Sequence, residues 1–172
     1  MSVNAKFAEA ARRAQGCAVI FAGSDSDRPH VEKIMEGLEA FRIPYEVRIC
    51  SAHKEPARLL ELLAEYESLG APLAYIAVAG GTDALSGTLS FHALAPVISC
   101  PPDAPNPSCL ANPPGSSNAT IYDPGNVGKF VAQMYAVFNA GYAERLRRAR
   151  QEKLARLEEK DRELRERYGR VD

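Results

Sequence analysis

Three short runs of small and polar residues, two of which contain glycine, each follow an apolar run and carry the residue types that bind anions and transfer protons. The first run alternates serine and aspartate, as Gly23-Ser24-Asp25-Ser26-Asp27. Glycine permits a sharp turn, serine hydroxyls donate to phosphate oxygens, and a helix that begins here adds free N–H groups at its positive dipole end. The run predicts a phosphate cradle in which Ser24 and Ser26 make polar or phosphate contacts and Asp27 binds sugar hydroxyls.

Helix capping is the competing interpretation of this first run. Serine and aspartate are preferred N-cap residues, so Ser26 or Asp27 at the start of a helix needs no ligand to explain it. The two uses are compatible, because a capped helix start still offers N–H groups to an anion. Taken alone, the run is weakly specific.

The second run contains a candidate proton-transfer group and reads Ser51-Ala52-His53-Lys54. An imidazole has an unperturbed pKa of about 6.5, which suits a group that must both accept and release a proton near neutral pH. Lys54 adds a positive charge for a phosphate or carboxylate. A lone histidine in a loop is more often structural or merely exposed, but the carboxyl ends of parallel strands share one edge, which places His53 beside the first run.

The third run, Gly80-Gly81-Thr82-Asp83, is followed by Ala84 and Leu85. Paired glycines at a strand end let a ligand approach the backbone closely, and Thr82 or Asp83 can cap the next helix. Three successive strands that end in such turns are stronger support for a site than any one of them. Together they define a pocket of nucleotide size that binds an anionic ligand.

The elements that must position these runs alternate along the chain between apolar and amphipathic segments, which is typical of β-α units around a parallel sheet. The predicted strands are 17–22, 45–50, 73–79, 96–99 and 119–122. Several are continuous apolar runs, as expected where helices cover both faces of a sheet. The predicted helices are 3–14, 28–41, 56–68, 84–92 and a segment from 126 onward.

Two regions depart from this alternation. Residues 101–115 contain six prolines, so they are predicted to form a long loop of the kind that often serves as a lid or binding loop. Residues 143–170 carry charges of both signs with a thin line of leucines, which predicts a solvated helix or one that lies on a neighbouring subunit. We therefore expect a catalytic domain over residues 1–142, with a short N-terminal helix, and a charged helical tail over residues 143–172.

The bulk properties narrow the class of protein. A chain of 172 residues with 46% hydrophobic and 25% charged residues is typical of one globular domain with appendages. A net charge of −1 argues against a nucleic-acid partner, and no apolar stretch approaches the roughly twenty residues that cross a bilayer. Four widely spaced cysteines are expected to be buried and reduced, and the N-terminus does not read as a signal peptide, so we expect a cytoplasmic location.

Taken together, these runs resemble a known family. Residues 18–100 are similar to the PurE family, whose members are aminoimidazole ribonucleotide carboxylases and carboxyaminoimidazole ribonucleotide mutases. The matching segments are GSDSD at 23–27, IPYEVRICSAHK at 43–54, AVAGGTDALSG at 77–87 and APVISCPP at 95–102. The combination of GSDSD and SAHK at this separation is highly specific, and looser similarity resumes over residues 112–136.

The resemblance implies a flavodoxin-like three-layer α/β/α sandwich with a parallel sheet, to which this chain adds a long charged C-terminal helix. It also implies a homo-octamer with active sites between subunits and no metal or organic cofactor. His53 maps to the family's general acid/base, which acts at the imidazole ring carbon that gains or loses carboxylate, and Gly80 and Gly81 map to the wall of the carbon dioxide pocket. The substrate-binding set that we predict is Gly23, Ser24, Asp25, Ser26, Asp27, Ser51, Ala52, Lys54, Gly80, Gly81, Thr82, Asp83 and Leu85.

Within the family, SAHK and the lack of a second histidine after the third run resemble the carboxylase branch (class II), which uses free carbon dioxide. The mutase branch usually has SAHR and that second histidine. The carboxylase branch typically reads Gly-Arg-Ser-Asn where this chain has Gly80-Gly81-Thr82-Asp83, so an arginine is lost and a carboxylate gained. The loop before Asn112 is also shortened, and Asn112 replaces the usual methionine.

The leading prediction is therefore a phosphoribosylaminoimidazole carboxylase that converts aminoimidazole ribonucleotide and carbon dioxide to carboxyaminoimidazole ribonucleotide in purine biosynthesis. The mutase of the same family is the second hypothesis. A divergent nucleotide-binding paralogue without catalysis is the third hypothesis, motivated by the altered loops at 81–83 and 103–112. A generic flavodoxin-like flavin module fits the alternation of elements equally well but leaves SAHK unexplained.

Overall fold

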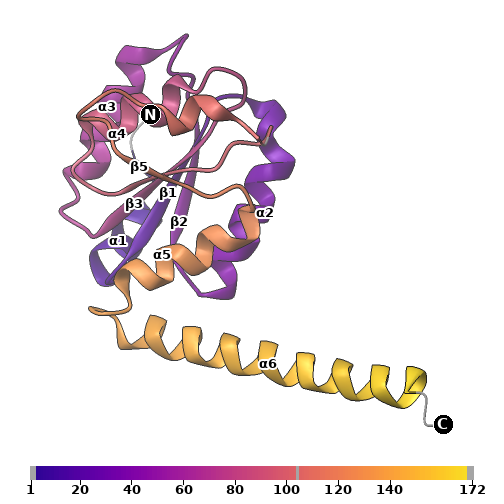
Figure 1. Cartoon of the computed structure of the whole chain (residues 1–172). Helices are drawn as coiled ribbons and strands as arrows, with labels where there is room; N and C mark the ends of the chain where they lie inside the picture. The colour runs from indigo at the N-terminus through magenta and orange to yellow at the C-terminus, as the bar shows by residue number, and fades with distance from the viewer. Residues whose placement is uncertain (1–2, 104, 170–172) are drawn as a thin grey trace.

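A five-stranded parallel sheet organises the chain, as the computed structural model, which describes residues 3–103 and 105–169, shows (Figure 1). The strands are β1 (Cys17–Ala22), β2 (Tyr45–Ile49), β3 (Leu73–Val78), β4 (Val97–Ser99) and β5 (Asn118–Thr120). Each pairs in parallel with its neighbour, and the spatial order is β2-β1-β3-β4-β5. This is the flavodoxin-like order, in which ligands bind at the carboxyl edge where the strand order reverses, between β1 and β3.

Helices cover both faces of the sheet and complete the predicted three layers. One face carries α1 (Ala5–Arg13), α3 (Pro56–Glu67) and α4 (Ala84–His92), and the other carries α2 (Arg28–Ala40) and α5 (Val127–Tyr135). The predicted fold class is confirmed. Shorter 3-10 helices span Asp25–Asp27, Pro107–Leu110 and Pro124–Asn126.

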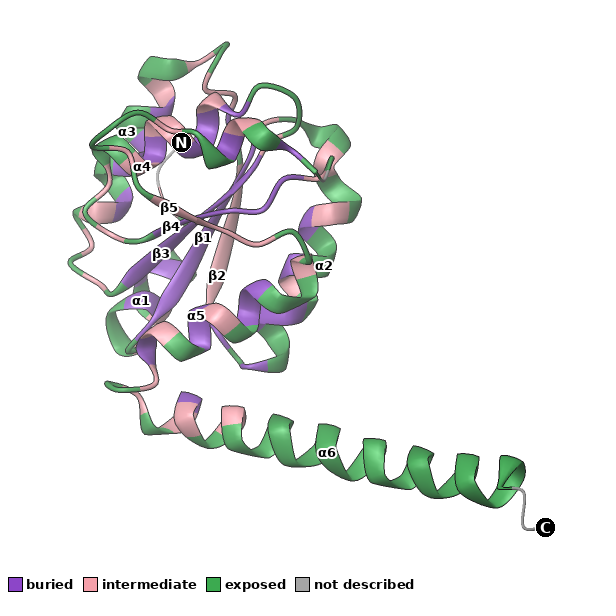
Figure 2. Ribbon diagram, in the orientation of Figure 1, coloured by how far each residue is buried: buried purple, intermediate pink, exposed green. Residues whose placement is uncertain are grey.

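The continuous apolar runs of the central strands follow from this layering. In β1, Ala18 and Ile20 belong to the core under α2 and α5, whereas Val19 and Phe21 belong to the core under α1 and α3. All six residues of β1 and all six of β3 are buried (Figure 2). A strand that is buried on both faces cannot alternate polar and apolar residues, which is the physical reason for the sequence pattern.

The structure refines several predicted boundaries. The helix expected from residue 126 onward divides into α5 and α6 (Ala140–Tyr168), because the Asn139 side chain accepts hydrogen bonds from the Gly141 and Tyr142 N–H groups and caps a new helix. The strand expected at 119–122 lies at Asn118–Thr120 instead. The proline-rich segment contains a turn of 3-10 helix, capped where the Asn106 side chain accepts from the Ser108 N–H.

The packing of α2 on α5 depends on two glycines. A Cβ atom added at Gly128 would lie 1.9 Å from the Gly37 carbonyl oxygen, so the two helix backbones approach more closely than any side chain allows. This close approach holds α2 against α5 on one face of the sheet.

The C-terminal helix α6 has one anchor and a long exposed remainder. Tyr142 is buried, and its hydroxyl donates to the Gly16 carbonyl oxygen at 2.6 Å, while Leu146 packs against the core. Beyond that point α6 runs away from the sheet with its side chains exposed (Figures 1 and 2). This confirms the predicted long charged helix. Within residues 3–103 and 105–169, no helix combines the length and the apolar character needed to span a membrane.

Candidate active site

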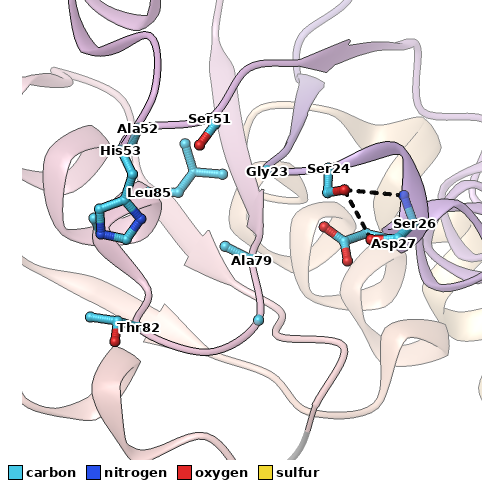
Figure 3. Close-up of a pocket in the computed structure, with 12 residues that line it drawn as sticks. Gly23, Ser24, Ser26, Asp27, Ser51, Ala52, His53, Ala79, Thr82 and Leu85 are labelled. Carbon is cyan, nitrogen blue, oxygen red and sulfur yellow. Dashed lines mark hydrogen bonds between the residues drawn. The ribbon is translucent and has the colours of Figure 1, made fainter.

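All three runs meet at the carboxyl edge of the sheet, where they enclose a cavity of about 290 Å³. Figure 3 shows His53 and Thr82 on one side of this cavity and Ser24 and Asp27 on the other, with Gly23 and Ala79 between them. The described residues that line it are Gly23, Ser24, Ser26, Asp27, Ser51, Ala52, His53, Ala79, Gly80, Thr82, Ala84 and Leu85.

The first turn (residues 23–27) is held mainly by its own hydrogen bonds. The Ser24 hydroxyl oxygen accepts from the Ser26 N–H at 3.3 Å and from the Ser26 hydroxyl at 2.9 Å, the two contacts drawn as dashed lines in Figure 3. The Gly23 N–H donates to the Val78 carbonyl oxygen at 2.9 Å, which joins the turn to the end of β3. Ser24 therefore caps the 3-10 helix. Of the two residues that the capping interpretation names, Asp27 occupies the N-cap position of α2, but its side chain makes no capping hydrogen bond.

The second turn (residues 51–54) presents His53 to the cavity. The Cys50 N–H continues the sheet by donating to the Ala22 carbonyl oxygen at 2.9 Å, and the Glu55 N–H donates to the Ser51 carbonyl oxygen at 2.8 Å. These bonds fix both ends of the turn before α3 begins. The His53 side chain is exposed and lines the cavity, so its ring is accessible to a ligand there.

The third turn (residues 80–83) depends on residues from far along the chain. Gly81 has a φ of +66°, its N–H donates to the Asp103 carboxylate at 2.7 Å, and its carbonyl oxygen accepts from the Asn106 side chain at 2.8 Å. The Ser108 hydroxyl accepts from the Asp83 N–H at 2.9 Å. We call Asp103, Asn106 and Ser108 the clamp, because they hold the third turn from the proline-rich segment.

Asp27 and His53 are the only aspartate, glutamate or histidine residues among the described lining residues. Burial raises the pKa of the Asp27 carboxyl above its usual value, although the Ser24 N–H and the nearby His30 act in the opposite direction. In the clamp, hydrogen bonds from the Gly81 N–H and the Asn106 side chain lower the pKa of the Asp103 carboxyl. None of the described lining residues is lysine or arginine, so a bound phosphate would depend on N–H and hydroxyl donors or on groups from another chain.

Comparison with known proteins connects this cavity to a family. A model of the AIR carboxylase family matches residues 17–156, a span that contains all three turns and the clamp. The chain belongs to the AIR carboxylase family.

Curated relatives of this AIR carboxylase family member carry the corresponding names. Phosphoribosylaminoimidazole carboxylase of Treponema denticola is 33% identical, with 85% of this chain and 96% of that protein covered. The human bifunctional phosphoribosylaminoimidazole carboxylase/phosphoribosylaminoimidazole succinocarboxamide synthetase is 36% identical over 86% of this chain. This chain covers only 36% of the length of that bifunctional relative.

Solved structures support the same relationship. The crystal structure of Treponema denticola PurE matches with a TM-score of 0.79 and 31% identity, covering 90% of this chain and 99% of that one. A variant of PurE2 from the same organism gives a TM-score of 0.82 at 32% identity, covering 86% of this chain and 97% of that one. Both therefore share the fold of this family member over most of its length.

Four residues of the predicted substrate-binding set do not line the cavity. Asp25 forms an ion pair with Arg28 at 2.6 Å, and Lys54 is exposed outside the cavity. Gly81 bonds to the clamp. The Asp83 carboxylate is buried, and it accepts from the Ser86 N–H at 2.9 Å and the Ser99 hydroxyl at 2.8 Å, so it caps α4 and faces away from a ligand.

Sequence reasoning missed Ala79 and Ala84, which also line the cavity. Both flank the third run, and their small size at a strand end and helix start was the available signal. The clamp was also missed, although the proline-rich segment was recognised as a loop of functional interest. Within residues 3–103 and 105–169, no group of three or more His, Cys, Asp or Glu side chains is placed to hold a metal ion.

Proposed function

We propose that this chain is a phosphoribosylaminoimidazole carboxylase, which adds carbon dioxide to aminoimidazole ribonucleotide to give carboxyaminoimidazole ribonucleotide in purine biosynthesis. The observation that carries the proposal is His53 in the wall of a cavity built from three strand-end turns, in a member of the AIR carboxylase family. The relatives named phosphoribosylaminoimidazole carboxylase support it.

The chemistry requires one proton transfer. A bond forms between the imidazole ring carbon of the substrate and the carbon of carbon dioxide, and the same ring carbon then loses its hydrogen as a proton. His53 in its neutral form accepts that proton, and it returns the proton in the reverse, decarboxylating direction. The reaction as proposed uses no metal or organic cofactor, as the family resemblance implies.

The first turn is proposed to hold the ribose phosphate. Ser24 and Ser26 line the cavity, and the Ser24 hydroxyl, which accepts from the Ser26 hydroxyl, keeps its own proton to donate to a phosphate oxygen. The 3-10 helix that Ser24 caps leads directly into α2. The Asp27 carboxylate, on the same side of the cavity, is proposed to accept from the ribose hydroxyls. This arrangement leaves the base to extend toward His53 and Thr82 on the opposite side (Figure 3).

The third turn favours the carboxylase over the mutase. The lining residues of this turn and of the start of α4 are Gly80, Thr82, Ala84 and Leu85, none of which has an ionisable side chain. The Asp83 carboxylate is directed into the core. A small, uncharged wall suits neutral carbon dioxide and places no second proton-transfer group beside His53. The carbon-dioxide-using class II branch is therefore our proposal within the family.

We also propose a homo-octamer with active sites between subunits. The absence of lysine and arginine among the described lining residues supports this, because a neighbouring chain can supply the positive charge that a phosphate needs. An octamer of 18.7 kDa chains would have a mass of about 150 kDa by light scattering. A cytoplasmic location remains part of the proposal, supported by four free, buried cysteines.

The test is a two-substrate assay on the wild-type chain. Purified protein should consume aminoimidazole ribonucleotide with bicarbonate or carbon dioxide and without ATP. His53→Asn should lower turnover by roughly 10²- to 10⁴-fold, the range for loss of a general acid/base, while the mass of the assembly stays unchanged. His92→Asn, an exposed histidine in the last turn of α4 and outside the cavity, is the matched control and should keep full activity.

Three results would contradict the proposal in different ways. Full activity in His53→Asn would remove the role of the imidazole. Turnover of the mutase substrate alone would assign the chain to the mutase branch. Tight ribonucleotide binding without turnover of either substrate would favour a nucleotide-binding protein that has lost catalysis.

A further inference from the structure

The clamp binds both backbone polar groups of Gly81, its N–H and its carbonyl oxygen. The Asp103 carboxylate accepts from the Gly81 N–H at 2.7 Å, while the Asn106 side-chain amide donates to the Gly81 carbonyl oxygen at 2.8 Å. The Ser108 hydroxyl lies 3.0 Å from the same carbonyl oxygen. These partners are 22 to 27 residues away in sequence, so nothing local to the third turn supplies them.

Asn106 is the centre of the clamp. It is 3% exposed, and its amide group also donates to the Asp103 carboxylate at 3.0 Å while its oxygen accepts from the Ser108 N–H at 3.0 Å and from the Ser108 hydroxyl at 2.6 Å. These contacts use the full donor and acceptor capacity of an asparagine side chain. Its backbone is fixed as well, since the Tyr122 hydroxyl donates to the Asn106 carbonyl oxygen at 3.2 Å.

The clamp holds a residue that is flanked on both sides by residues of the cavity wall. Gly80 and Thr82, on either side of Gly81, line the cavity, and Thr82 lies on the same side of it as His53 (Figure 3). Gly81 adopts a left-handed conformation in open space, with no atom within 4 Å of a Cβ built there, so side-chain packing does not hold it. Its orientation depends on the hydrogen bonds of the clamp.

We propose that Asn106 is a positioning residue, which acts through Gly81 to set the third turn against the reacting end of the substrate. This inference rests on the proposed carboxylase function for its kinetic effect. It goes beyond that function by assigning a role to a buried residue that does not touch the cavity. Because the first turn is held by its own serines, the clamp should affect the chemical step far more than the binding of the ribose phosphate.

The decisive variant is Asn106→Asp, which keeps the shape of the side chain but removes both of its N–H donors. The acceptor for Ser108 remains, the bond to the Gly81 carbonyl is lost, and two carboxylates now face each other at the former 3.0 Å contact with Asp103. We expect kcat to fall by about 10-fold or more, as misplacement of groups near a reacting centre does. The Kd of the carboxylated product should change by less than about threefold, under 1 kcal/mol.

A charge swap separates positioning from a general loss of stability. In the double variant Asp103→Asn/Asn106→Asp, the amide introduced at position 103 can donate to the carboxylate introduced at position 106, and the like-charge repulsion disappears. The double variant should therefore recover part of the kcat lost in Asn106→Asp. Asn126→Asp is the matched control, since Asn126 also donates to an aspartate three residues earlier, Asp123, at 3.2 Å but lies outside the cavity; it should keep the wild-type kcat.

Hydrogen exchange of the third turn provides a readout that does not need activity. Amides of residues 79–84 should exchange at least about tenfold faster in Asn106→Asp than in the wild type, while those of residues 23–27 keep their rate. An inactive wild type would refute the proposed function and leave this exchange test in force. Wild-type kcat together with unchanged exchange in Asn106→Asp would overturn the inference, as would equal losses of kcat and of product affinity.

Discussion

The first turn and the third turn border the same cavity at the same edge of the sheet, but different parts of the chain hold them. Ser24 and Ser26 bond to each other within the first turn. The third turn takes its hydrogen bonds from Asp103, Asn106 and Ser108 in another segment. A turn held by its own hydrogen bonds keeps its shape when other segments change in sequence. A turn held by another segment changes shape when that segment changes.

The departures of this chain from the family pattern fall in the third turn and the segment that holds it. There the sequence has Gly81, Asp83 and a shortened proline-rich loop. The structure links these changes through hydrogen bonds. The Asp103 carboxylate accepts from the Gly81 N–H, and the Ser108 hydroxyl accepts from the Asp83 N–H. The turn and the loop thus form one unit. The first turn, which is proposed to bind the ribose phosphate, has no hydrogen bond to that unit among those described.

The largest expected difference between the two turns is in stability, and it follows from their caps. Asp83→Ala removes a buried carboxylate that caps α4 and leaves the Ser99 hydroxyl, also buried, without its acceptor. We expect a loss of roughly 2–4 kcal/mol in the free energy of unfolding, measured by urea denaturation. Ser24→Ala removes the exposed cap of the first turn, so its cost should stay below about 1 kcal/mol. Equal losses in both variants would contradict the comparison.

A second prediction separates strain from position. Gly81 and Gly70 have nearly equal positive φ values, +66° and +60°, and neither has an atom within 4 Å of an added Cβ. Gly81→Ala and Gly70→Ala should each lower the free energy of unfolding by about 1 kcal/mol, the cost of a left-handed alanine. Only Gly81→Ala should also lower kcat, because Gly70 lies in the connection between α3 and β3. A matching loss of kcat in Gly70→Ala would show that the effect is general.

The same contrast explains what could be predicted from the sequence. Strands such as Cys17–Ala22 and helices such as Ala84–His92 were predicted with the observed bounds, because burial on both faces and capping leave local patterns. The meeting of three turns at one edge followed from parallel topology. The partners of Gly81 could not be predicted, since asparagine and serine in a proline-rich loop have no spacing that reveals a contact 25 residues away. Asp83 is predicted both as a candidate cap of the next helix and as a substrate contact, and the structure confirms the cap. Its bond with the Ser99 hydroxyl, which directs the carboxylate into the core, leaves no local sequence pattern.

The smallest predicted effects concern Asp27 in the first turn and Asp103 in the clamp that holds the third turn, and they have opposite signs. The pKa of Asp27 is raised in the folded protein, chiefly by burial, so the folded state binds more protons than the unfolded chain at pH values just above the ordinary 3.8. The free energy of unfolding contributed by Asp27 therefore falls as pH rises through that window. The pKa of Asp103 is lowered by the Gly81 N–H and by Asn106, so its contribution is present above 3.8 and is lost as pH falls through the folded value.

Asp27→Asn should therefore gain stability relative to the wild type on going from pH 3 to pH 7, whereas Asp103→Asn should lose it over the same interval. Each change should remain below about 1 kcal/mol, because solvent screens groups that are this exposed. Urea denaturation at several pH values measures both curves against the wild type under one set of conditions. Difference curves of the same sign would contradict the opposite pKa shifts of Asp27 and Asp103. Either burial would not raise the pKa of Asp27, or the hydrogen bonds from the Gly81 N–H and Asn106 would not lower the pKa of Asp103.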